Sequence, residues 1–341
     1  MSLLSYVLKR ILLAIPVVIG VLTITFILSK AMPGDPVMTL LSQAQIRISP
    51  EIYNVMVRQL GLDQPLHIQY FRYLADVFTG NWGESISYAR GSDVWDLIVF
   101  RLPKTMDLAF FSMIIASYLG VKIGVISAKH RNKFRDTIFR SFGIIGVAFP
   151  VFVLGMLMQY WIGYKWDLFP VTYYKSIEYM EPPFVTGFYM IDALLAGQLY
   201  KIPDYLYHLA MPVFCLSFVT LAGIIRQTRS SMLEVLQQDY IRTARAKGCK
   251  EKIVIRNHAL RNSMIPTVTV IGLNFATILS GAVILESTFG LRGIGLLLID
   301  AAASRDYWLI NACMVVLALI YVITTLVIDI LYGFLDPRIR Y

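Results

Sequence analysis

Few residues in this 341-residue chain have the types and spacing that catalysis or metal binding requires. The histidines are scattered and predict no metal-ligand set; they are His67, His130, His208 and His258. The three cysteines contain no CxxC pair, and so few exclude a disulfide scaffold. The sequence also lacks HExxH, Gly-x-Ser-x-Gly and any Gly-Lys dipeptide, so it has no Walker A phosphate loop. Any ATP chemistry must therefore belong to another polypeptide.

Polar side chains inside apolar segments are the second kind of candidate functional residue. Burying such a group in lipid is expensive, so by default it indicates a route for a polar solute. The candidates for a substrate pathway are Gln159, Asn274, Ser280 and Glu286, with Asp107 at the outer end of another segment. The alternative interpretation is that these groups only form hydrogen bonds with neighbouring helices.

The elements that must position these residues are membrane spans. Hydrophobic residues make up 57% of the chain and charged residues 16%, against about half and about a quarter in an ordinary globular protein. About 20 apolar residues cross a bilayer as a helix. Six stretches qualify: Ile11–Leu28, Leu108–Ser127, Phe142–Tyr164, Leu209–Ile225, Ser263–Leu285 and Tyr307–Ile328. The sequence therefore predicts an all-α polytopic membrane protein with six transmembrane helices.

The distribution of positive charge predicts the orientation of these spans. Residues 1–10, 128–140, 226–262 and 329–341 hold 18 Lys and Arg in 73 residues, whereas the alternate segments hold 12 in 144. Segments rich in Lys and Arg stay in the cytoplasm. We therefore expect both termini inside. The net charge of +9 reflects this asymmetry and does not indicate a nucleic-acid partner.

We expect three parts along the chain. Residues 1–30 form the cytoplasmic N-terminus and the first span, although a cleaved signal peptide is an alternative for this stretch. Residues 31–104 form a large external loop that is expected to be a folded subdomain. Residues 105–341 form a five-helix core, in which 226–262 is a cytoplasmic loop between the fourth and fifth spans.

The two shorter external loops carry different signals. Residues 165–208 are rich in aromatic residues and proline, which suit the membrane–water interface. Residues 286–306 contain Gly290, Gly293 and Gly295, which predict a tight turn into a short interfacial or re-entrant helix over 296–303.

The cytoplasmic loop is the most informative segment. Leu233, Leu236, Tyr240 and Ala244 recur at helical spacing and predict an amphipathic helix that docks on a partner or lies on the membrane. Gly248 is expected to end this helix in the left-handed conformation. A second helix over 250–260 then leads into the fifth span. The alternative is a basic loop that only fixes topology.

The residues from Tyr240 to Gly248, followed by His258, Ala259, Leu260, Arg261, Asn262 and Pro266, resemble the coupling-loop signature of ABC importer permeases. That signature reads Glu-Ala-Ala, three residues, Gly, nine residues, then Ile-x-Leu-Pro. Aligned on Gly248, Arg242 takes the Glu position and Thr243 the first Ala, while Ala244 and Leu260 match. These departures are similar to the dipeptide/oligopeptide branch of the family.

Other segments resemble the same branch in the same order along nearly the whole chain. They are Tyr6–Arg10, Pro33-Gly34-Asp35-Pro36, Leu60-Gly61-Leu62-Asp63 with Pro65, Gly80-Asn81-Trp82-Gly83, Phe289-Gly290 with Gly293-Ile294-Gly295, and Asp336-Pro337-Arg338. No single one of these short motifs is specific, but the ordered set is.

The resemblance implies a permease subunit that forms half of a translocation pore for peptides. Its implied partners are a paralogous second permease, two cytosolic ATPases that bind ATP and Mg, an extracytoplasmic solute-binding protein, and membrane lipid. It assigns ATPase coupling to Arg242, Thr243, Ala244, Gly248 and Leu260, and it implies no catalytic residue and no cofactor in this chain.

Two other functions remain open at this point. Close relatives of this branch carry nickel chelates, glutathione or oligosaccharides, so the cargo is not fixed. A secondary transporter driven by an ion gradient would need paired mid-membrane charges and an internal repeat, and an intramembrane enzyme would need a nucleophile with a base. None of these features stands out in the sequence.

Overall fold

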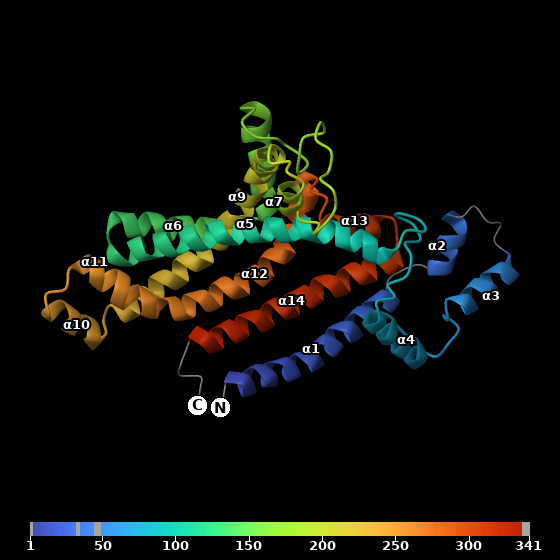
Figure 1. Ribbon diagram of the computed structural model, residues 1–341, viewed down its shortest axis with the longest axis horizontal. Helices are drawn as coiled ribbons and strands as arrows, with labels where there is room; N and C mark the ends of the chain where they lie inside the picture. Colours follow the sequence, from blue (N-terminus) through green and yellow to red (C-terminus); the bar gives the residue numbers. More distant parts are fainter. Residues whose placement is uncertain (1–2, 32–34, 44–48, 336–341) are drawn as a thin grey trace.

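Long helices form the body of the computed structural model, which describes residues 3–31, 35–43 and 49–335 (Figure 1). Five of them are long and apolar enough to cross a membrane: α1 (Leu3–Ala31), α5 (Val94–Lys129), α9 (Lys201–Val235), α12 (Arg261–Phe289) and α14 (Tyr307–Leu335). Each contains one of the predicted spans. Within the described ranges there is no strand, only an isolated bridge between Glu84 and Asp93.

Two helix pairs are bent, and one of them corrects a prediction. The stretch expected as one helical span over Phe142–Tyr164 is split into α6 (Phe134–Ala148), α7 (Val151–Met158) and the π-helical turn η1 (Gln159–Lys165), with a bend of 99°. The break falls at Phe149 and Pro150. Proline has no backbone N–H and forces the preceding residue out of the helical region, and Phe149 is accordingly extended, with ψ at 122°.

The second bend lies between the end of α12 and α13 (Ile294–Ala303), at 76°. Gly290 makes the turn with a φ of 63°, so the expected tight turn and the short helix after it are confirmed. Counting each bent pair as one span gives up to seven candidates. The structure therefore supports a multi-pass helical membrane protein without fixing the number of spans.

The central packing is between α5 and α9, and it depends on two glycines. A Cβ on Gly120 would lie 2.6 Å from Ile224 Cγ2, and one on Gly124 would lie 2.6 Å from Thr228 Cβ. Only glycine allows the two backbones to approach this closely, as is usual between membrane helices. The buried cluster around this contact includes Leu108, Leu209, Leu216, Leu279 and Leu285.

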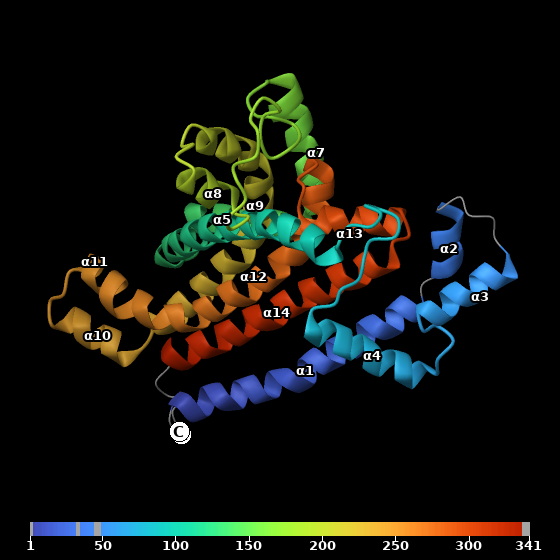
Figure 2. The same ribbon diagram turned by 45° about the vertical axis from the view of Figure 1, so that its right-hand side comes forward.

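The peripheral helices are arranged at opposite ends of the long axis (Figures 1 and 2). α14 lies between α12 and α1 in both views, and an ion pair joins Arg10 of α1 to Asp329 of α14 at 2.8 Å. At one end lie α10 (Asp239–Ala246), α11 (Glu251–Ile253) and the π-helical turn η2 (Val254–Leu260). At the other lie α2 (Pro36–Gln43), α3 (Pro50–Gln59) and α4 (Leu66–Thr79).

The longer segments between the spans are helical or irregular, and α5 crosses the boundary that was expected between residues 104 and 105. α5 begins at Val94, capped by the Asp93 side chain on the Trp95 N–H at 2.7 Å, so it runs through residues 104 and 105 without a break. The aromatic-rich loop contains α8 (Tyr189–Leu195). Pro33 and Gly34, and the stretch Asp336-Pro337-Arg338, lie outside the described residues.

Candidate functional site

The segment between α9 and α12 folds into a short helix, a left-handed turn and a second helix. Gly248 has a φ of 76°. Its N–H donates to the Arg245 carbonyl at 2.9 Å, and the Cys249 N–H donates to the Ala244 carbonyl at 3.2 Å. These two bonds are the Schellman pattern that closes a helix C-terminus. The predicted conformation of Gly248 is therefore confirmed.

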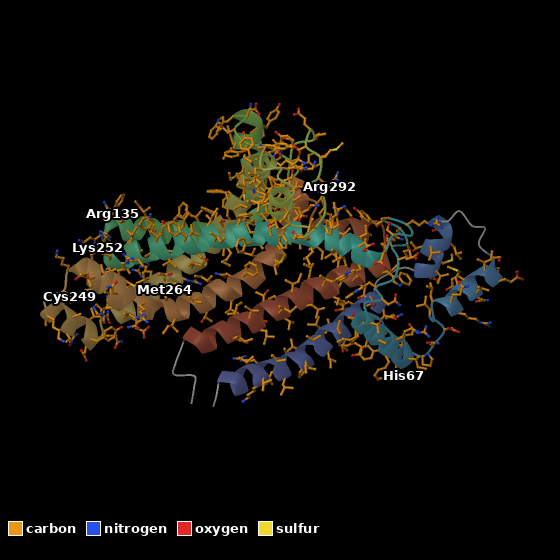
Figure 3. All side chains as sticks on the ribbon, in the orientation of Figure 1. His67, Arg135, Cys249, Lys252, Met264 and Arg292 are labelled. Carbon is orange, nitrogen blue, oxygen red and sulfur yellow. The ribbon has the colours of Figure 1, made fainter. Side chains whose placement is uncertain are left out.

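The chain then resumes as α11 and η2 and continues directly into α12. This bears out the helix predicted over 250–260 and makes the turn one end of a long helical element. Figure 3 shows Cys249 and Lys252 at this end of the molecule, with Arg135 above them.

Apolar contacts join the turn to three spans. Ile241 and Ala244 of α10 are buried in one cluster with Ala128 of α5, Met232 of α9 and Ala259 of η2. Because these side chains pack in one cluster, a shift of α10 disturbs the packing at the ends of α5 and α9 and along η2.

The apolar face of α10 differs from the predicted one. A single helix carrying Leu233, Leu236 and Tyr240 on one face was expected, but the chain breaks after Leu236, and Gln238 is extended with ψ at 149°. The break changes the register. Ile241 is fully buried, whereas Tyr240 is 42% exposed.

The residues assigned to coupling divide into two sets. Arg242, Thr243 and Gly248 lie on the exposed side, and the Arg242 side chain is 75% exposed. Ala244 is buried and Leu260 is partly buried, and both pack in the apolar cluster beneath α10. The first set forms a surface, and the second holds that surface on the spans.

Polar contacts brace the turn. Arg245 donates two hydrogen bonds to Glu251, at 2.8 and 3.1 Å, across the Gly248 turn. Bonding to this carboxylate raises the pKa of Arg245, so the guanidinium stays charged. The Asn262 amide donates to the Tyr240 hydroxyl at 2.9 Å and ties the start of α12 to α10.

The four pathway candidates are dispersed. Gln159 donates to the carbonyls of Val171 and Thr288, at 2.8 and 2.9 Å, and so joins η1 to the end of α12. Asn274 lies in α12 facing Gly223 of α9, and its buried Nδ2 has no partner within the described ranges. Ser280 lies in α12, but its side chain is outside the described part.

Glu286 occupies a closed polar site at the α12–α13 bend. It is 1% exposed, and its carboxylate accepts from the Thr105 hydroxyl at 2.5 Å and from the Leu296 N–H at 3.0 Å. Thr105 also accepts from the Ile294 N–H at 2.9 Å. The carboxylate thus accepts a hydrogen bond from the first turn of α13, where backbone N–H groups lack partners within the helix. No hydrogen bond given by the structure joins any two of Gln159, Asn274 and Glu286.

Two buried acidic residues that the sequence did not single out make further long-range polar contacts. Asp136 accepts both Arg229 bonds at 2.7 Å, together with the Ser127 hydroxyl, and joins α6 to α9 and α5. Asp306 accepts from Ser85 at 2.6 Å and from the Ser87 N–H at 2.9 Å. Arg229 is 93 residues from Asp136, and Ser85 is 221 residues from Asp306, so no local pattern reveals either pair.

No group of three His, Cys, Asp or Glu side chains among the residues placed in the structure has a metal-binding arrangement. What the geometry provides is mechanical: a small exposed helix and turn packed on the ends of three long apolar helices. These features define a multi-pass membrane protein with a short, exposed helix and turn at one end of its long helices.

Comparison with known proteins gives the family. The profile described as "binding-protein-dependent transport system inner membrane component" matches residues 120–341, and its N-terminal counterpart matches residues 3–109. The chain belongs to this family and is an ABC importer permease subunit, a multi-pass protein of the cytoplasmic membrane.

The relatives cover the whole chain. The dipeptide transport system permease protein DppB of Escherichia coli is 39% identical, over 99% of both chains. The di/tripeptide transport system permease protein DppB of Pseudomonas aeruginosa is 38% identical, also over 99% of both. The oligopeptide transport system permease protein AppB of Bacillus subtilis is 36% identical over 99% of both.

Proposed function

We propose that this permease subunit forms half of the translocation pore of an ATP-driven importer of dipeptides and oligopeptides. The names of the full-length relatives support the cargo class, because each refers to dipeptides, tripeptides or oligopeptides. The proposed complex contains a paralogous second permease, two cytosolic ATPases and an extracytoplasmic solute-binding protein. ATP and Mg bind in the ATPases, and this chain performs no hydrolysis.

The observation that carries the proposal is the packing of α10 on three spans. Ile241 and Ala244 share one buried cluster with Ala128 at the end of α5, Met232 at the end of α9 and residues of η2, which leads into α12. A partner that moves α10 therefore moves those ends together. In the proposed cycle, ATP binding draws the two ATPases towards each other, α10 follows, and the pore opens outward; hydrolysis returns it inward.

The proposed topology places α10 in the cytoplasm, with six spans and both termini on the same side. The positive charge of residues 226–262, nine Lys and Arg, supports this orientation. Arg242, Thr243 and Gly248 then form the surface on which an ATPase docks, and Ala244 and Leu260 fix that surface to the spans.

Asn274 is the strongest candidate for the pathway. Its amide is buried in a membrane helix, has an unpartnered Nδ2 and faces the small residue Gly223. Such a group is costly in lipid unless a polar ligand or partner meets it. Ser280 lies on the same helix. Glu286 and Gln159 act in this proposal as supports for the outer end of the pathway, because both already bond to neighbouring elements.

Uptake measurements test the proposal. Cells that lack other peptide importers would express the chain with its partner subunits and receive radiolabelled dipeptide, glutathione, a nickel chelate or an oligosaccharide. We expect dipeptide uptake that stops on ATP depletion by arsenate and persists when an uncoupler removes the ion gradient. We expect Ile241→Asp, which places a charge in the cluster beneath α10, to abolish uptake.

The matched control is Arg135→Gln, which removes an exposed basic residue at the same end but outside residues 226–262, and it should transport normally. Dipeptide uptake that survives ATP depletion and stops with the uncoupler would contradict the proposal and favour a secondary transporter. Uptake of another cargo in place of dipeptide would contradict the cargo class.

A further inference from the structure

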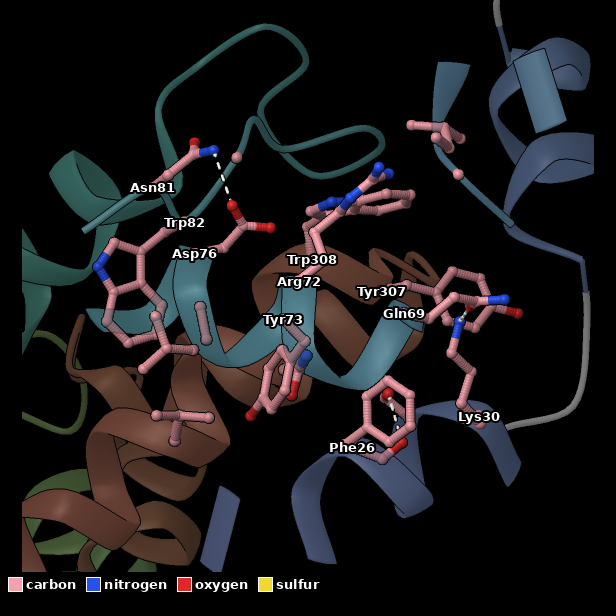
Figure 4. Close-up of a pocket in the computed structure, with 18 of the residues that line it drawn as sticks. Phe26, Lys30, Gln69, Arg72, Tyr73, Asp76, Asn81, Trp82, Tyr307 and Trp308 are labelled. Carbon is pink, nitrogen blue, oxygen red and sulfur yellow. Dashed lines mark hydrogen bonds between the residues drawn. The ribbon is translucent and has the colours of Figure 1, made fainter. Parts of the chain in front are cut away.

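A cavity of about 350 Å³ lies between α1, α4 and α14, at the end of these helices away from the Arg10–Asp329 ion pair (Figure 4). Lys30 of α1, Arg72 and Asp76 of α4, and Asn311 of α14 contribute its polar lining. Phe26 and Trp308 are among its apolar lining residues.

α4 has two distinct faces, and only one of them lines the cavity. Gln69, Arg72, Tyr73, Asp76 and Val77 recur at helical spacing and line the cavity. The other side carries an apolar stripe of Ile68, Phe71, Ala75 and Phe78, in which Phe71 is 66% and Phe78 is 69% exposed. An apolar stripe of this kind on a short helix that lies across the ends of two membrane spans is typical of a helix in the membrane–water interface.

The cavity lies on the side of α14 away from α12 and the central packing (Figures 1 and 2). α14 lies between α1 and α12 (Figures 1 and 2), so it separates the cavity from the part of α12 that carries Asn274. The nearby half of α1 exposes Ile24, Ile27 and Leu28, at 59%, 58% and 48%. A ligand in the cavity therefore has apolar surface beside it that suits acyl chains.

Among the described residues, no carboxylate pairs with Lys30 or Arg72 of the cavity. Lys30 donates to the neutral Gln69 amide oxygen at 2.5 Å. Arg72 has no hydrogen-bond or ion-pair partner in residues 3–31, 35–43 and 49–335, and its guanidinium rests against Gly61, where a Cβ would lie 2.0 Å from Nη1. Two cations without carboxylate partners suit a phosphate group.

The cavity also offers acceptors. Asn311 Oδ1 is buried and has no partner within the described part of the chain, and the Asp76 carboxylate accepts only from Asn81, at 3.2 Å. An acceptor without a donor is costly to bury. A ligand that carries both a phosphate and a hydrogen-bond donor would satisfy both sets of groups.

We propose that this cavity binds the headgroup of a membrane phospholipid that carries a hydrogen-bond donor, either an ammonium or a glycerol hydroxyl. Lys30 and Arg72 bind its phosphodiester, Asp76 and Asn311 accept from its donor, and its acyl chains lie along α1. The bound lipid joins α4 to α1 and α14. This site is independent of the proposed coupling surface, since it lies at the opposite end of the molecule (Figure 1).

Native mass spectrometry tests this site. The full chain, purified with the subunits that accompany it, would be reconstituted in nanodiscs of phosphatidylcholine alone or with phosphatidylethanolamine or phosphatidylglycerol, and the retained lipids counted after extraction. We expect one retained phosphatidylethanolamine or phosphatidylglycerol and no retained phosphatidylcholine, which has no donor. Each cation near an anionic group contributes about fivefold, so Lys30→Gln with Arg72→Gln should reduce retention more than tenfold.

Two matched variants separate binding from folding. Arg58→Gln removes an exposed cation from α3 that does not line the cavity and should retain the lipid. Lys30→Arg with Arg72→Lys keeps both charges and should retain it as well. Equal retention by the double Gln variant and the original chain would overturn the proposal. Retention of phosphatidylcholine to the same extent would also overturn it, as would displacement of the lipid by inorganic phosphate.

Discussion

Substitution of Gly248 by residues of increasing size separates the fold of the turn at Gly248 from its proposed use as a docking surface for an ATPase. The backbone at this position is left-handed, with a φ of 76°, and nothing lies within 4 Å of the position that a Cβ would occupy. A non-glycine residue other than asparagine or aspartate therefore incurs the left-handed penalty of about 1–2 kcal/mol. Because the space around it is open, a larger side chain adds no further penalty within this chain.

The expected result is a dissociation between two measurements. Gly248→Ala and Gly248→Arg should lose the same free energy of unfolding, about 1–2 kcal/mol, and Gly248→Asn should lose less because asparagine tolerates this conformation. Association with the ATPases should depend on size. Arginine extends into the docking surface, so we expect it to weaken association at least tenfold, or about 1.4 kcal/mol, whereas alanine should weaken it little.

The assay combines thermal unfolding of each purified variant with the amount of ATPase that co-purifies in mild detergent. Equal co-purification with Gly248→Ala and Gly248→Arg would refute the assignment of Gly248 to the docking surface. A much larger loss of stability in Gly248→Arg than in Gly248→Ala would refute the claim that the site is open.

Three further variants test the contacts that hold the scaffold, each by thermal unfolding. Arg229→Met leaves the buried Asp136 carboxylate without its two 2.7 Å bonds, so we expect the free energy of unfolding to fall by about 3–5 kcal/mol. Asp136→Asn should lower it less, because the Arg229 side chain can reach water. Equal losses in the two variants would contradict this reasoning. Gly293→Ala places a Cβ 2.3 Å from the Glu286 carboxyl and should lower the free energy of unfolding by about 1–3 kcal/mol. The control is Gly20→Ala, where nothing lies within 4 Å of the added Cβ, and it should cause no loss. Burial alone would raise the pKa of Asp192, but hydrogen bonds from Thr186, Val185 and Gly187 outweigh it and lower the pKa. That stabilisation is complete above the ordinary carboxyl pKa of about 3.9 and is lost as the pH falls through the lowered value. Asp192→Asn should therefore lower the free energy of unfolding by about 1.5–3 kcal/mol at neutral pH. The difference in stability between this variant and the original chain should shrink in acid, and a difference that stays constant would contradict the assignment.

The long elements were predictable because their signals are local. Runs of about 20 apolar residues place α1, α5, α9, α12 and α14. The turn at Gly248 was predictable for the same reason, since a glycine after a short periodic segment indicates a left-handed helix end. The short helix α13 followed from the glycines that precede it.

Breaks within helices were harder to predict, and two examples show why. Pro150 is visible in the sequence, but membrane helices tolerate proline when neighbours satisfy the freed backbone groups, so the 99° bend depends on tertiary contacts. The break after Leu236 has neither glycine nor proline near it. The break buries Ile241 in place of Tyr240. A helical pattern continued across the break therefore predicts the wrong buried face.

The buried polar contacts could not be predicted from one sequence. Asp136 and Arg229 are 93 residues apart, and Ser85 and Asp306 are 221 apart. Each side chain alone looks like an ordinary loop or interface residue. Glu286 was identified as a polar group at the outer end of a span, but its partners Thr105 and Leu296 only become evident when the bend brings α13 back onto α12.

The measurement that tests the central claim most directly is a pull-down of the tagged chain from native membranes in mild detergent, with mass identification of the proteins that accompany it. We predict two nucleotide-binding subunits and a second multi-pass permease. Recovery of the chain alone, with uptake that is insensitive to ATP depletion and sensitive to an ion gradient, would contradict the account.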